Sequence, residues 1–156
     1  MGQVKLFERA ADDKKPDPLA NLAAEAVGER AAAWRRVCED LVRLSEHLEL
    51  DERIVIQSVF ETGMPLAMLA RLSGRSPRAV QRQVKRIVAR MESPMFRFVA
   101  TGLDLLPRDV QPVARRHYLW GWPLRRVAKE LDLKLHEVRA KAMVAQVHKG
   151  LLATGN

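Results

Sequence analysis

A short sequence pattern occurs twice in this chain and constrains its fold more than any other feature. Gly63-Met-Pro-Leu matches Gly121-Trp-Pro-Leu at an offset of 58 positions, since 121 − 63 = 58. Further apolar residues align at the same offset: Leu69 and Ala70 with Val127 and Ala128, and Val80 with Val138. Because an internal repeat at a fixed period is typical of a duplicated supersecondary unit, we expect two copies of one small unit.

The second copy has the spacing of two helices joined by a tight turn. Its first apolar residues recur at intervals of three and four, as on one face of a helix: Leu124, Val127, Ala128 and Leu131. Asp132 follows, where a tight turn requires a residue that tolerates a left-handed backbone. We expect a second helix that buries Val138 and Ala142 and ends near Gly150. This order predicts a helix-turn-helix, whose second helix fits a major groove.

The first copy has clear turn chemistry. Gly74 occupies the turn, Ser76 the helix-capping position and Pro77 the first helical position, and each residue type is favoured there. We expect a first helix over 64–73 and a second over 76–91. The second helix would turn four apolar residues inward: Val80, Val84, Ile87 and Val88. The chain therefore predicts two helix-turn-helix units in tandem.

The rest of the chain also predicts helices, so the expected fold class is all-α. No segment has the alternating apolar pattern of a strand. We expect a disordered arm over 1–18, an N-terminal helical segment over 19–50, the first unit over 51–92, a bridging helix over 93–105 and the second unit over 106–156. The arm combines charge and proline, a composition typical of disorder.

The N-terminal segment carries a long apolar stripe. Alanine-rich residues 19–27 predict a short helix before Gly28, and residues 29–50 predict a long amphipathic one. Its apolar side comprises Trp34, Val37, Cys38, Leu41, Leu44 and Leu48. The stripe either packs on the first unit or, because its spacing is heptad-like, pairs with a second copy in a homodimer. Cys38, the single cysteine, lies in the stripe, so we expect a buried thiol.

Positive charge is concentrated in the two repeated units. Residues 1–50 carry 8 Lys+Arg and 10 Asp+Glu (8 − 10 = −2), whereas residues 51–156 carry 19 and 9 (19 − 9 = +10). Between Arg71 and Arg90 there are seven basic residues and no acidic one. Such a field attracts polyanions, although many charge runs are only a solvated helix face. Because this charge falls on a helix expected to be exposed, we expect double-stranded DNA as a partner.

The first unit offers residues for both bases and phosphates. Arginine reads guanine and glutamine reads adenine in the major groove, so the expected base contacts are Arg78, Gln81 and Arg82. Ser76 and the first amides of the same helix can meet a phosphate. Further phosphate contacts are expected from the surrounding basic residues: Arg71, Arg75, Lys85, Arg86 and Arg90.

The second unit is poorer in such residues. Its matching DNA-contacting positions are Lys134, His136, Glu137, Arg139 and Lys141, with Arg125 and Arg126 as phosphate contacts. Glu137 would accept from a cytosine amine or repel the DNA backbone. Leu135 would be exposed to the groove without a polar function there. By composition we therefore expect the second unit to be the weaker DNA reader.

Residues 106–142 resemble region four of bacterial RNA polymerase sigma factors. The matching stretches are Leu106-Pro107-Arg108, Arg116-His117-Tyr118 to Gly121, Leu124-Arg125-Arg126-Val127-Ala128-Lys129-Glu130-Leu131-Asp132-Leu133 and Val138-Arg139. Residues 64–90 resemble, more loosely, the sigma region that precedes region four. The family reads an upstream promoter element while docking on the polymerase. The resemblance therefore implies contacts with DNA from Lys134, His136, Glu137, Arg139 and Lys141, and RNA polymerase as a further partner.

The chain departs from the family at the turn and in its overall content. Sigma factors usually have Gly where Asp132 stands and a Ser or Thr cap near Lys134. The chain also has no segment like the aromatic-rich one with which sigma factors bind the melted promoter strand. We therefore do not expect a complete initiation factor.

Catalysis, a cofactor and a metal have little support in the sequence. The four histidines are scattered and lack Cys or carboxylate partners at metal-ligand spacing: His47, His117, His136 and His148. No glycine-rich phosphate loop or nucleophile elbow is present. Three aromatic residues are interpreted as core residues rather than as a base-stacking platform: Tyr118, Trp120 and Trp122. We expect no enzyme, no catalytic residue, no cofactor and no metal.

The leading hypothesis is a sequence-specific double-stranded DNA-binding transcriptional regulator that uses both units. One alternative is a sigma-like adaptor or anti-activator that docks on RNA polymerase or another regulator, which Leu135, Glu137 and exposed Trp120 and Trp122 would favour. Another is a DNA-packaging or transposition accessory protein that recognises DNA ends. No apolar run reaches the roughly 18 residues of a membrane span, so we expect no membrane partner and a cytoplasmic, nucleoid-associated location.

Overall fold

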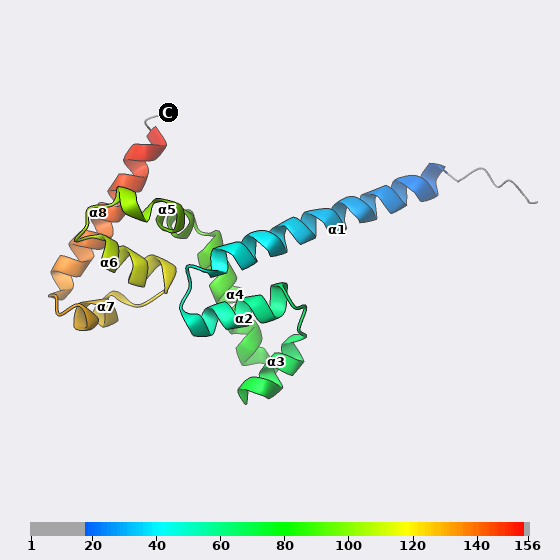
Figure 1. Cartoon of the computed structure of the whole chain (residues 1–156), viewed down its shortest axis with the longest axis horizontal. Helices are drawn as coiled ribbons and strands as arrows, with labels where there is room; N and C mark the ends of the chain where they lie inside the picture. Colours follow the sequence, from blue (N-terminus) through cyan, green and yellow to red (C-terminus); the bar gives the residue numbers. More distant parts are fainter. Residues whose placement is uncertain (1–17, 155–156) are drawn as a thin grey trace, which may run out of the picture. The chain divides into compact units, whose positions relative to one another are not determined.

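The computed structural model describes residues 18–154, and every regular element in this range is a helix or helical turn (Figure 1). The expected all-α class is thus confirmed for the described part of the chain. The arm expected over 1–18 lies outside it except for Pro18, which begins the first helix. None of the described helices is long and apolar enough to cross a membrane.

The chain divides into two compact parts, residues 1–36 and residues 37–156. Helix α1 (Pro18–Ser45) continues through Gly28, so the break expected there is wrong. A Cβ at Gly28 would meet no atom within 4 Å, and one exposed helical glycine costs only about 1 kcal/mol. The helix ends before the expected boundary near Leu50, because the Leu48 amide turns back to donate to the Ser45 carbonyl at 3.0 Å.

Only the C-terminal part of the apolar stripe is buried. Leu41, Leu44 and Leu48 belong to the main core of residues 37–156, whereas Trp34 and Val37 are 59 % and 44 % exposed. The three leucines therefore pack within the chain, on a core built from both copies of the repeat and the range between them rather than on the first unit alone. Cys38 lies just outside this buried part and is half-buried, so the expectation of a fully buried thiol is wrong.

Helices α2 (Leu50–Phe60), α3 (Leu66–Ser73) and α4 (Pro77–Glu92) contain the first copy of the repeat. Gly74 ends α3 with a left-handed φ of 64°, and Ser76 Oγ accepts a hydrogen bond from the Ala79 amide at 3.2 Å. Both agree with the expected turn chemistry. Helix α3 begins at Leu66 rather than Met64, because Pro65 is extended. These helices enclose a small core of Leu69, Ala70, Val80 and Val84.

Short helices and helical turns connect the two copies. Helix α5 (Pro94–Gly102) and the 3₁₀ turn η1 (Leu103–Leu105) occupy the range expected for one bridging helix. Ser93 Oγ caps α5 by accepting from the Phe96 amide at 3.2 Å. Helix α6 (Gln111–Ala114) then passes into η2 (Arg115–Leu119), a turn of π-helix.

Helices α7 (Leu124–Glu130) and α8 (Leu135–Thr154) contain the second copy. Asp132 adopts the left-handed backbone expected of it, with φ 53°. Helix α8 continues through Gly150, so the end expected there is wrong. Gly150 keeps a helical backbone, and nothing lies where its Cβ would be. The second copy has its own small core: Val113, Trp122, Val127, Ala128, Val138 and Ala142.

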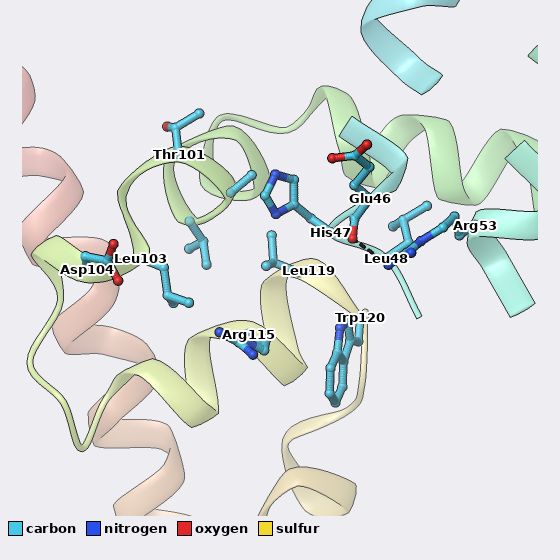
Figure 2. A pocket seen from close by; sticks show the side chains of 12 residues that line it. Glu46, His47, Leu48, Arg53, Thr101, Leu103, Asp104, Arg115, Leu119 and Trp120 are labelled. Atoms are coloured by element: carbon cyan, nitrogen blue, oxygen red, sulfur yellow. Dashed lines mark hydrogen bonds between the residues drawn. The ribbon is translucent and has the colours of Figure 1, made fainter. Parts of the chain in front are cut away.

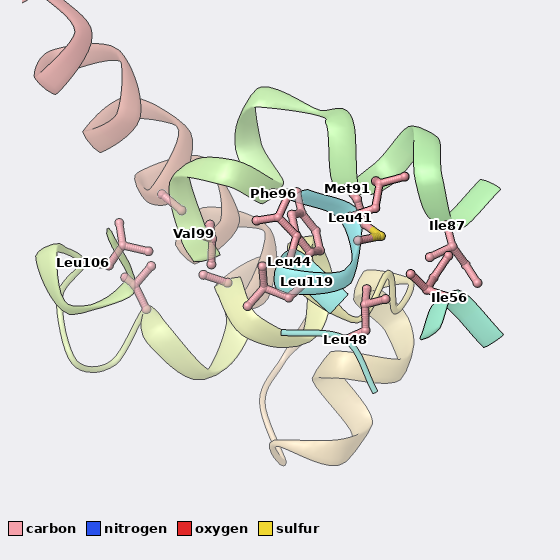
Figure 3. Close-up of a cluster of buried hydrophobic side chains, with 13 residues drawn as sticks. Leu41, Leu44, Leu48, Ile56, Ile87, Met91, Phe96, Val99, Leu106 and Leu119 are labelled. Carbon is pink, nitrogen blue, oxygen red and sulfur yellow. The ribbon is translucent and has the colours of Figure 1, made fainter. Parts of the chain in front are cut away.

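The main core of residues 37–156 draws residues from α1, α2, α4, α5, α6, η2 and α8 (Figure 3). Phe96, Ile56 and Ile87 are fully buried in it, and a change such as Phe96→Ala costs about 3–5 kcal/mol in cores of this kind. Tyr118 and Trp120 pack against this core and are half-buried. Both copies of the repeat are thus attached to one apolar centre.

Candidate nucleic-acid interface

The outer face of α4 carries a row of exposed polar and basic side chains, which we call the basic row: Arg78, Gln81, Arg82, Lys85 and Arg86. The row is exposed because the apolar residues of α4, which recur at intervals of three and four, face inward. Among the described residues, no acidic group forms an ion pair with the basic row. The fold therefore does not neutralise its charge.

A hollow of about 340 Å³ lies beside the basic row, lined by Arg75, Ala79, Arg82, Gln83 and Arg86. Gln83 positions Arg75, whose guanidinium donates to Gln83 Oε1. Sequence reasoning missed Gln83, because neither charge nor apolar spacing marks it. The Arg75 and Arg86 guanidinium groups at this hollow suit a phosphate, which arginine binds through paired N–H donors.

Two further residues that were expected to contact phosphate are exposed near α4. Ser76 caps the start of α4, and Arg71 lies in the last turn of α3. Ser76 Oγ accepts from the Ala79 amide at 3.2 Å, which leaves its own hydroxyl proton to donate to another acceptor. The start of α4 also carries the positive end of the helix dipole. This end of α4 is therefore suited to an anion.

Arg90 does not belong to this surface, contrary to the phosphate role expected for it. Its guanidinium forms an ion pair with Glu52 of α2, and the two side chains are 17 % and 15 % exposed. A Cβ at Gly121 would overlap that guanidinium, so glycine at this position allows Arg90 to lie there. Arg90 thus attaches the end of α4 to α2 and to the loop before α7.

At the start of α8, Lys134, His136 and Arg139 are exposed. Lys141 is less accessible to DNA than these three residues, because it forms an ion pair with Asp109 and its side chain is only 23 % exposed. The hydrogen bond from Lys141 holds the pKa of the Asp109 carboxyl below its ordinary value. The DNA-contacting role expected for Lys141 therefore conflicts with the contact that it makes.

The two arginines of α7 differ in their surroundings. Both are exposed, but the guanidinium carbon of Arg126 lies 3.5 Å from the centre of the Trp122 ring. A cation over an aromatic face is attracted by the ring quadrupole. Arg126 therefore has a packing role in addition to its expected phosphate contact, and Arg125 is the freer of the two.

Glu137 and Leu135 serve the fold of α8. Glu137 Oε2 accepts a hydrogen bond from the Lys134 amide at 2.8 Å, which supplies half of a capping box where the sequence lacks a Ser or Thr cap. The signal that sequence reasoning missed is the spacing of three between these residues. Leu135 is half-buried against the second small core, so its expected exposure to a groove is wrong.

Trp122 attaches the second copy to the N-terminal cap of α2. The ring is 7 % exposed, and its Nε1 donates to Glu49 Oε2 at 2.8 Å. The expectation that Trp122 is exposed, which would favour an adaptor, is therefore wrong. Trp120 is half-buried. Glu49 and Glu52 together hold both copies of the repeat, through Trp122 and Arg90 respectively.

Residues 18–154 contain no group of three His, Cys, Asp or Glu side chains placed to hold a metal ion. Two of the histidines instead approach main-chain carbonyls through Nδ1: His117 that of Trp122 at 2.8 Å, and His148 that of Val144 at 3.0 Å. Comparison with known protein families, with characterised proteins and with solved structures found no match. The basic row and its hollow are thus the site from which a function must be inferred.

Proposed function

We propose that this chain binds double-stranded DNA sequence-specifically through two helix-turn-helix units, regulates transcription and catalyses no reaction. The units are α3–α4 and α7–α8, whose turns contain the left-handed residues Gly74 and Asp132. The observation that carries the proposal is the basic row of α4, which is exposed and not neutralised by any acidic residue in the described chain. A helix with such a face fits a major groove.

Within the first unit, the side chains divide into base readers and phosphate binders. Arg78, Gln81 and Arg82 lie in the N-terminal half of α4, the part of a recognition helix that reaches base edges. Arg75 and Arg86 line the hollow with Arg82 and are assigned to phosphate. The remaining phosphate contacts in this proposal are Arg71, Ser76 and Lys85. Phosphate contacts set the register, and base contacts supply the specificity.

The second unit contributes a smaller share of the binding. Lys134, His136 and Arg139 are exposed at the start of α8 and Arg125 on α7, whereas Lys141 is held by Asp109. Two such units would enter successive major grooves about 34 Å apart. The second unit would then extend the site and add orientation more than affinity.

The test is binding of the full chain to duplexes selected from a random pool. Arg78→Glu with Arg82→Glu should abolish specific binding and leave the helical content unchanged, because both side chains are exposed. The matched control is Arg35→Glu with Arg36→Glu, which changes the net charge equally on the exposed surface of α1. Nanomolar binding by the Arg78/Arg82 variant, or equal loss in the control, would contradict the assignment.

A protein-binding role is the second candidate, and the surface of α8 favours it for the second unit. From Met143 onward, α8 exposes large apolar residues at 53–65 %: Met143, Val147, Leu151 and Leu152. Exposed apolar patches mark protein-binding sites, so a sigma-like adaptor would dock on RNA polymerase here. In the same selection, absence of DNA binding would support the adaptor. Weak uniform binding would support a DNA-packaging or transposition accessory protein.

A further inference from the structure

A cavity of about 450 Å³ is lined by residues between Glu46 and Trp120 and shares no residue with the basic row (Figure 2). Its walls come from the segment that joins α1 to α2, from α2, from α5 with η1 and from η2. The volume is within the range of small-molecule sites, about 300–1,000 Å³. Neither the fold nor the proposed DNA contacts account for this cavity.

Two arginines on its wall have donor groups without an acidic partner. Arg53 donates through Nη2 to the Glu46 carbonyl at 2.6 Å, but its Nε is buried without a hydrogen-bond partner in the described protein. Arg115 is exposed and forms no ion pair among the described residues. Because that Nε is buried, a ligand in the cavity cannot reach it, and the outer nitrogens of Arg53 and the exposed Arg115 guanidinium are left to bind an anion. Neither guanidinium has a carboxylate partner among the described residues, so an anionic ligand would supply one.

The carboxylates at the cavity restrict the charge of that ligand. Glu46 and Asp104 are exposed, and neither side chain pairs with Arg53 or Arg115. Figure 2 shows Asp104 and Arg53 at opposite sides of the cavity. Like charges repel, so the two carboxylates disfavour a phosphate or other multiply charged anion and permit a single carboxylate.

The rest of the wall mixes apolar and polar side chains. Leu48, Leu103, Leu119 and the Trp120 ring line it together with His47 and Thr101 (Figure 2). Arg115 and Leu119 begin and end the π-helical turn η2, and turns of this kind are often found at functional sites. Small-molecule sites combine apolar side chains with a few placed polar groups, and this lining contains both. The apolar part of a ligand would therefore lie against the leucines and the indole.

We propose that this cavity binds a small organic monocarboxylate with an apolar body. The carboxylate lies between Arg53 and Arg115, and the body packs against Leu119 and Trp120. Arg53 is adjacent in sequence to Glu52, which holds Arg90, and Trp120 is two residues before Trp122, which donates to Glu49. The ligand would thus bind beside both of the contacts that hold the copies of the repeat. A resulting change in DNA affinity rests on the proposed function, whereas binding of the ligand does not.

The experiment measures binding of 3-phenylpropionate to the full chain without DNA, followed by the NMR signals of the backbone and of the Trp120 indole N–H. We expect saturable binding with a Kd of about 1 mM or tighter, which is reasonable for a ligand of this size. The neutral 3-phenylpropionamide has the same shape and should bind at least about tenfold more weakly, because it lacks the charge for two guanidinium groups.

Variants locate the site. Arg115→Gln should weaken binding about tenfold while leaving the fold intact, because Arg115 is exposed. Arg53→Gln should do the same, and Arg115→Gln decides the outcome if loss of the Arg53–Glu46 hydrogen bond disturbs the fold. Lys129→Gln, an exposed cation on α7, is the control and should bind like the unmodified chain. Absence of saturation, equal binding of the amide, or unchanged binding by Arg115→Gln would overturn the proposal.

Discussion

The two copies of the repeat share a backbone plan but use their basic side chains differently. In the first copy, the basic row of α4 is exposed and unpaired within the described residues. In the second, Lys141 is paired with Asp109, Arg126 lies over Trp122, and Glu137 caps its own helix. A similar motif therefore does not imply a similar surface, because charge that holds the fold together is not available to a ligand.

The largest expected effect is the loss of DNA affinity when charge is reversed in the first copy instead of the second. Arg78→Glu with Arg82→Glu should weaken binding by at least about 100-fold, because each base contact is worth about 1–3 kcal/mol and reversal adds repulsion. Lys134→Glu with Arg139→Glu changes the net charge equally in the second copy and should cost less than about tenfold. Titration of both variants against the same selected duplex at one salt concentration measures the difference. Equal losses would mean that both copies read DNA alike.

Arg90 tests whether the end of α4 serves stability or binding. Arg90→Ala leaves Glu52 largely buried without its partner, and we expect a loss of about 2–3 kcal/mol in the free energy of unfolding. The variant should still bind DNA with an unchanged salt slope, because Arg90 makes no phosphate contact in our assignment. Arg86→Ala is the comparison: it should reduce the salt slope by about one and leave stability nearly unchanged. Urea unfolding and a salt titration distinguish the two.

Gly63 and Gly121 are equivalent positions of the repeat with the same φ of 70°, which makes them a matched pair. Gly63→Ala should cost about 1 kcal/mol, the penalty of a left-handed alanine in open space. Gly121→Ala should cost about 1 kcal/mol more, because its Cβ would displace the Arg90 guanidinium. Thermal unfolding of both variants checks this. Equal costs would show that Arg90 moves aside freely.

The smallest expected effect is on the pH dependence of stability, through the Lys141–Asp109 pair. The hydrogen bond from Lys141 lowers the Asp109 pKa from its ordinary 3.8, so the pair contributes stability above that value. This contribution is lost as the pH falls through the lowered pKa of the folded state. Asp109→Asn should therefore lower the urea midpoint slightly at about pH 6 and not at about pH 2. A difference that persists at low pH would show that the aspartate acts through packing instead of charge.

The local chemistry of turns and caps could be predicted from the sequence. Gly74, Ser76 and Asp132 occupy the conformations that their residue types favour, because such preferences act over only a few residues. Gly28 and Gly150 show the limit of that reasoning. Glycine ends a helix where the backbone must become left-handed, and these two remain helical among residues that continue the helix.

The composition of the candidate site was less predictable. Arg90 and Glu52 are separated by 38 residues, and Lys141 and Asp109 by 32. No charge pattern along the chain indicates which acidic residue each cation will meet. The exposed arginines of α4 were predictable because helical spacing separates them from the apolar face, whereas Gln83, Arg90 and Lys141 required knowledge of tertiary neighbours.

Glu49 and Glu52 lie about one helical turn apart, at the start of α2, and one holds each copy of the repeat. Under the proposed function, two copies held in this way require a fixed spacing between the two half-sites of the operator. Inserting about five base pairs between the two half-sites rotates one of them to the opposite side of the duplex, since B-DNA repeats every 10–10.5 base pairs. A protein with a flexible linker would tolerate that change of helical phase, whereas this one should bind only one half-site at a time.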